Sequence, residues 1–153
     1  MYRVNQTILK KTRPHFVELK VNVGNNNMST ILIIEDDQII RELYCVLLEE
    51  HIIVEAENSN DALNLATKHQ PDLIITDLCI PDSRGNMPEQ GNAFELVRAL
   101  RKNNSKAKIL VCSGLCYDRQ IQTYAIVAGA NASLPKNGSI NAFTQTVDLV
   151  LTN

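Results

Sequence analysis

The sequence predicts an α/β domain in which a doubly wound, five-stranded parallel sheet carries helices on both faces. Three observations predict this fold. Short runs of β-branched and aliphatic residues alternate with amphipathic stretches, which is typical of strands joined by crossover helices. The runs are apolar without alternation, as in strands buried on both faces. The 153 residues, of which 44% are hydrophobic, suffice for one core.

The expected elements follow one another along the chain from Ile31. Strands are expected at residues 31–34, 52–56, 73–76, 109–112 and 132–134. Helices are expected at residues 39–50, 61–69, 94–103, 118–128 and 140–151. Gly129 follows the fourth helix as a typical C-cap, and Pro71 ends the second helix. Residues 78–91, rich in Pro, Gly, Asp and Ser, indicate a long loop.

The domain is expected to span residues 28–153, preceded by a leader of residues 1–27 that is flexible or belongs to a mis-assigned start. The leader carries five Lys or Arg against one Glu, a net +4, so the chain's net charge of −2 leaves −6 for the domain. An acidic domain does not indicate direct nucleic-acid binding. We expect the leader to be dispensable. In the rival interpretation, its alternating residues Val17, Leu19, Val21 and Val23 form an added edge strand.

A cytoplasmic location is expected. The apolar runs are far shorter than the roughly 20 residues of a membrane-spanning helix, and no secretory signal is recognisable. The four cysteines lack the paired spacing of zinc sites, so small, mostly buried thiols are the simplest interpretation. They are Cys45, Cys79, Cys112 and Cys116.

Polar residues stand at or near the carboxyl ends of four of the expected strands. Glu35 and Asp36 follow the first, Asp77 the third, Ser113 the fourth and Lys136 the fifth. Because the carboxyl ends of parallel strands lie at one edge of a sheet, these side chains should gather there. Clustered carboxylates repel one another unless a cation joins them, and an all-oxygen cluster suits Mg²⁺. A carboxylate held there can attack a phosphoryl group whose charge a lysine and a hydroxyl help to neutralise.

Each of these residues also has an ordinary explanation. Asp37 suits a helix N-cap, Asp77 and Ser113 suit turns, and Lys136 suits a solvated loop. Only their ordered combination favours a site. Two related enzyme classes, dehalogenase-like phosphatases and Toprim enzymes, require Asp-x-Asp after a strand, but Cys79 stands at the second position here. A flavodoxin-like cofactor binder would need a phosphate-binding loop after the first strand, where the acidic residues would repel phosphate.

Four segments, ILIIEDD, DLIITDLCIP, ILVCSG and GANASLPK, resemble the signatures of the response-regulator receiver family, and the resemblance covers residues 28–153. It implies a phosphorylation-dependent switch of a two-component or phosphorelay system, with Asp77 as phosphoacceptor and Mg²⁺ as cofactor. By the same resemblance, Ser113 is the switch hydroxyl and Lys136 pairs with the phosphoryl group. The implied metal ligands are Glu35, Asp36, Asp77 and the backbone carbonyl of Cys79, with Asp36 the more direct ligand of the first pair.

The implied phosphodonor is a histidine kinase or a histidine phosphotransfer protein. The implied downstream target binds the face formed by the fourth helix, the fifth strand and the fifth helix, with no direct contact to nucleic acid or membrane. Such a domain assists its own phosphoryl transfer and hydrolysis but is otherwise not an enzyme. The alternative is a receiver-like module that binds proteins without being phosphorylated.

Three positions depart from the family's pattern. The loop at residues 81–91 is longer than usual and borders the site, so it is expected to affect partner choice or access. Ser133 stands three residues before Lys136, where the family usually has an aromatic switch residue. Asn137 follows Lys136 in place of the usual proline. The usual coupling between a hydroxyl and an aromatic ring is therefore not expected here.

Overall fold

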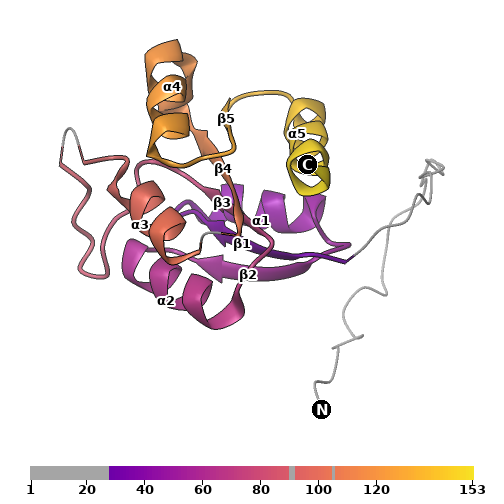
Figure 1. Cartoon of the computed structure of the whole chain (residues 1–153), viewed down its shortest axis with the longest axis horizontal. Coiled ribbons are helices and arrows are strands. Elements are labelled where there is room, and N and C mark those ends of the chain that lie inside the picture. The colour runs from indigo at the N-terminus through magenta and orange to yellow at the C-terminus, as the bar shows by residue number, and fades with distance from the viewer. Residues whose placement is uncertain (1–27, 90–91, 105) are drawn as a thin grey trace.

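The computed structural model describes residues 28–153 except 90–91 and 105, so the predicted leader lies outside the described residues. Five parallel strands form a central sheet with helices on both faces, as the sequence predicts (Figure 1). The elements are β1 (Thr30–Ile34), α1 (Gln38–Leu47), β2 (Ile52–Ala56), α2 (Ser59–His69), β3 (Leu73–Thr76), α3 (Glu95–Asn103), β4 (Lys108–Ser113), the 3₁₀ turn η1 (Gly114–Tyr117), α4 (Arg119–Ala128), β5 (Ala132–Pro135) and α5 (Ile140–Thr152).

The strand order is β2-β1-β3-β4-β5, which places β1 and β3 side by side near the centre of the sheet. In their register Ile31 pairs with Leu73 and Ile34 pairs with Thr76. The two strands therefore end level with each other. The residues that follow them start from adjacent positions at the carboxyl edge of the sheet.

The two faces of the sheet bury separate sets of apolar side chains. Leu32 and Ile34 point to one face and Ile31 and Ile33 to the other, because successive side chains of a strand alternate. The first face packs against residues of α2, α3 and α4, and the second packs against residues of α1 and α5. The last four β1 side chains, from Ile31 to Ile34, are almost completely buried, which explains why this run is apolar throughout.

The expected strands agree with the observed ones to within one residue at either end. The second helix starts two residues earlier than expected, because the Asn58 side chain caps it by accepting a hydrogen bond from the Asp61 amide at 2.9 Å. The turn η1 was not predicted, because four residues are too few to show a helical period. Gly129 is confirmed as the C-cap of α4, with a φ of +119°.

Two of the four cysteines, Cys112 and Cys116, are buried, and Cys45 and Cys79 are half-buried. All four are free thiols. Within the described residues, each helix is too short or too polar to cross a lipid bilayer.

Candidate functional site

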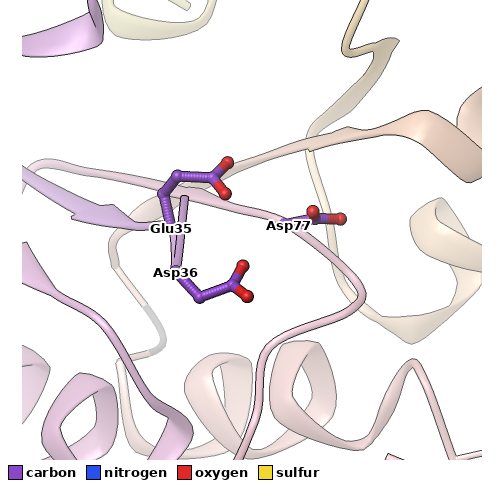
Figure 2. Close-up of side chains that lie close together, drawn as sticks. All are labelled: Glu35, Asp36 and Asp77. Carbon is purple, nitrogen blue, oxygen red and sulfur yellow. The ribbon is translucent and has the colours of Figure 1, made fainter. Parts of the chain in front are cut away.

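Three carboxylates meet at the carboxyl edge of the sheet. Glu35 and Asp36 follow β1 and Asp77 follows β3, and an oxygen of each lies within 4.8 Å of the other two (Figure 2). Glu35 and Asp77 are only 1% and 7% exposed, whereas Asp36 is exposed to solvent. The cluster forms because β1 and β3 end side by side, as their register requires.

Lys136 supplies the counter-charge for two of these carboxylates. It follows β5, and its backbone amide donates to the Ser113 carbonyl at 3.1 Å. The long side chain reaches across the end of β4, so that its Nζ lies 2.8 Å from Asp77 Oδ2 and 2.8 Å from Glu35 Oε2. Burial lowers the pKa of the Lys136 ammonium, but its hydrogen bonds to Asp77 and Glu35 and their negative charges raise it above the usual value, so Lys136 is charged.

The Asp77 carboxylate is oriented by donors on both of its oxygens. Its Oδ1 accepts the backbone amides of Leu78 at 2.6 Å and Cys79 at 3.2 Å, while Oδ2 accepts from Lys136. Burial raises the pKa of Asp77, but hydrogen bonds from Lys136 and Ser113 and the charge of Lys136 more than offset it. The net pKa is below the usual value, so Asp77 is an ionised, aimed carboxylate, as a nucleophile must be.

Glu35 is held differently. Burial raises its pKa above the usual value, against hydrogen bonds from Lys136 and from the Asp37 amide. Among the described residues its Oε2 accepts no hydrogen bond of acceptable geometry, although Lys136 Nζ lies 2.8 Å away. A buried carboxylate oxygen with acceptor capacity left, beside two further carboxylates, fits a hard divalent cation such as Mg²⁺.

Ser113 ends β4 beside the carboxylates and is 1% exposed. Its Oγ accepts the Leu115 amide at 3.3 Å, which starts the turn η1, and the nearby hydroxyl helps to lower the pKa of Asp77. Ser113 therefore links the surroundings of Asp77 to the first hydrogen bond of η1. Ser133 lies half-buried on the edge strand β5, paired with Val111, so no aromatic ring stands there.

Asp37 lies outside the carboxylate cluster. Its Oδ1 accepts the amides of Ile39 at 2.9 Å and Ile40 at 3.2 Å, which confirms the N-cap interpretation. Cys79 contacts the site through its backbone, since its amide donates to Asp77. The metal-binding role of its carbonyl stays a prediction.

Two features beside the site were not predicted. Arg41 of α1 is buried and donates to the Glu35 carbonyl at 2.7 Å. Tyr44 stacks on Phe143 with ring centroids 4.5 Å apart, and its hydroxyl lies 3.0 Å from Cys112 Sγ, directly before Ser113. One signal was available for the arginine: Arg41 shares a helical face with the apolar residues Tyr44 and Leu48, both buried.

The long loop after β3 is ordered at its start and tied to α2. The Ser59 amide donates to the Pro81 carbonyl and the Ser83 amide donates to Asn60 Oδ1, each at 2.8 Å. Hydrogen bonds from the Asn86 side chain and backbone lower the pKa of Asp82 to about 2 and close a turn. Hydrogen bonds therefore attach the start of this loop to the first residues of α2. Residues 90–91 lie outside the described part.

The chain matches the model of the response regulator receiver domain over residues 31–148. It is 29% identical to the transcriptional regulatory protein DegU of Brevibacillus brevis over 130 residues, which cover 82% of this chain and 51% of that protein. It is 25% identical to the chemotaxis protein CheY of Halobacterium salinarum over 108 residues, which cover 69% of this chain and 82% of that protein. The chain spans about half the length of several of the curated relatives it matches.

Solved structures agree on the fold. A putative response regulator from Chloroflexus aurantiacus superposes with a TM-score of 0.69 at 23% identity, covering 82% of this chain and 99% of that one. The family match extends over most of the described residues and includes all four strand ends at which the site is built. The chain therefore belongs to the response regulator receiver domain family.

Proposed function

We propose that this chain is a phosphorylation-controlled signalling switch whose phosphoacceptor is Asp77. The observation that carries the proposal is the geometry of that carboxylate: two backbone amides and the Lys136 ammonium donate hydrogen bonds to it, and its pKa is lowered. These groups have the chemistry needed to neutralise a transferred phosphoryl group.

In the proposed transfer, a carboxylate oxygen of Asp77 attacks the phosphorus of a phosphohistidine. The new O–P bond forms as the P–N bond breaks, and the imidazole leaves with the bonding electron pair and takes up a proton. Lys136 then pairs with the phosphoryl oxygens and Ser113 donates a hydrogen bond to them. The donor would be a histidine kinase or histidine phosphotransfer protein, and the chain would assist its own dephosphorylation without acting on other substrates.

The residues also suit a divalent cation. Asp36 and Asp77 would hold it with help from Glu35 and the backbone carbonyl of Cys79, and Asp36 is the exposed member through which it would enter. When bound, Mg²⁺ supplies positive charge beside the transferring phosphoryl oxygens.

The output would travel from Ser113 into η1 and α4. Ser133 is too small to fill space vacated by Ser113, so no ring movement at that position carries the signal. A shift from a mostly inactive to a mostly active state needs a differential of a few kcal/mol, and one charge-assisted hydrogen bond plus one ion pair are of that size. The target would bind in the cytoplasm along α4, β5 and α5, where β5 is an edge strand and Val127 of α4 is 80% exposed.

The alternative, a binding module that is never phosphorylated, is favoured by one observation, the serine at position 133. One experiment separates the two. The full chain is incubated with Mg²⁺ and a small acyl phosphate, reduced with borohydride, and mapped by peptide mass spectrometry. The proposed function requires homoserine, the reduction product of an aspartyl phosphate, at position 77. Homoserine elsewhere, or none, rejects the proposal, and the second outcome supports the binding module.

A further inference from the structure

We infer that Arg41 is a positioning residue of the proposed metal site, which fixes the peptide between Glu35 and Asp36 and thereby aims the Asp36 carboxylate at Asp77. The inference rests on the proposed function, whose cation site it refines. It assigns a role to Arg41, a buried residue of α1 that donates hydrogen bonds to the Glu35 carbonyl and to two glutamates outside the site.

The backbone of Glu35 is held from two sides. Its amide donates to the Ala56 carbonyl at the end of β2 at 3.0 Å, and its carbonyl accepts from Arg41 Nη1 at 2.7 Å. The arginine bond is buried and charge-assisted, which makes it one of the stronger hydrogen bonds of this edge. Because a peptide group is planar, holding the Glu35 carbonyl also holds the amide nitrogen and Cα of Asp36.

Asp36 depends on this restraint more than its neighbours do. The side chain of Glu35 is fixed by burial and by Lys136, and that of Asp77 by two amides and Lys136. Asp36 is exposed, and within the described residues its carboxylate accepts no hydrogen bond. The backbone therefore sets the Cα–Cβ direction of Asp36, whose carboxylate points toward the cluster in Figure 2.

The arginine is itself held by two acceptors at the end of β2. Arg41 Nε lies 3.1 Å from Glu55 Oε2 and Nη2 lies 2.7 Å from Glu57 Oε1, leaving Nη1 directed at the Glu35 carbonyl. A planar guanidinium serves three acceptors in fixed directions, which a lysine with a single nitrogen does not. The two glutamates also offset the charge of Arg41, so it adds no uncompensated positive charge beside a cation site.

Mg²⁺ affinity tests the inference independently of phosphorylation. The full chain is unfolded thermally over a range of Mg²⁺ concentrations, and the dissociation constant is taken from the concentration dependence of the stabilisation. We expect Arg41→Lys and Arg41→Met to weaken Mg²⁺ binding about tenfold, the low end for loss of a group that orients metal ligands. Arg98→Lys makes the same exchange at an exposed arginine of α3 and should bind Mg²⁺ like the wild type.

A double-mutant cycle separates positioning from a general loss of stability. If Arg41 acts through Asp36, adding Arg41→Lys to Asp36→Ala causes no further loss of affinity. Losses that add fully, unchanged affinity in both Arg41 variants, or a wild type that does not bind Mg²⁺ would each overturn the inference. A wild type that binds Mg²⁺ in this Arg41-dependent way but yields no homoserine at position 77 would reject the proposed function alone.

Discussion

Replacing Lys136 with methionine tests the electrostatic balance of the site. The substitution keeps a long apolar stem and removes the ammonium that contacts Glu35 and Asp77 at 2.8 Å. Both carboxylates are then left buried without their counter-charge. We expect the metal-free variant to be much less stable than the wild type and Mg²⁺ to restore part of the loss, because a divalent cation supplies the missing positive charge.

The size of the expected loss in the free energy of unfolding follows from the burial of Lys136 and its two carboxylate partners. Removing one partner of a buried ion pair costs about 3–5 kcal/mol. Since the Lys136 side chain is 17% exposed, we expect the low end, about 3 kcal/mol. If the free energy of unfolding falls by about 2 kcal/mol per molar urea, the urea concentration at the midpoint of unfolding should fall by about 1.5 M.

The loss should also depend on pH in a defined direction. Burial already raises the pKa of Glu35, and removing Lys136 should raise it further. The same change should raise the pKa of Asp77, which Lys136 holds below its usual value in the wild type. The native variant then binds protons that the unfolded chain releases, so the deficit relative to the wild type shrinks as pH falls from about 7 toward about 5. Urea unfolding without metal measures this, with the exposed Lys68→Met as control. Equal midpoints in variant and wild type, or a deficit that grows as pH falls, would refute the reasoning.

Two further substitutions and one truncation test other parts of the chain. Asp36→Ala should weaken Mg²⁺ binding strongly and raise the metal-free stability by relieving repulsion, and unchanged affinity would count against the cation site. Ser113→Ala should still accept phosphate but show weak amide chemical-shift changes across residues 113–136. The full wild-type pattern in that variant, or no shifts reaching α4 in the wild type, would reject the route through η1. Removal of residues 1–27 should leave phosphorylation intact, and a shortened chain that unfolds or is not phosphorylated would overturn this.

Much of the fold could be predicted because its strands are short, apolar and separated by helical periods. The runs around Ile33 and Ile75 have no polar alternation, which only a sheet covered on both faces explains. Parallel strands also place their carboxyl ends together, so the meeting of Glu35, Asp77 and Lys136 followed from the fold class. The strand order was not predicted, because it depends on the direction of each crossover.

The finer geometry of the site depends on packing that no local pattern contains. Lys136 contacts Glu35 as well as Asp77 because β5 lies two strands from β3, which leaves the lysine to reach across the end of β4. Arg41 reaches the Glu35 carbonyl only because α1 packs with that face toward the end of β2. Sequence periodicity indicates which face of a helix is apolar, but not how the helix is rotated against each strand.

The most direct test of the central claim is the intact mass of the chain after incubation with a small acyl phosphate. Four samples suffice: wild type and Asp77→Asn, each with Mg²⁺ and with a chelator. The account predicts the added mass of one phosphoryl group in the wild type with Mg²⁺ and in none of the other three. An equal yield of adduct in Asp77→Asn would contradict Asp77 as the phosphoacceptor, and an equal yield in the chelator would contradict the requirement for the cation.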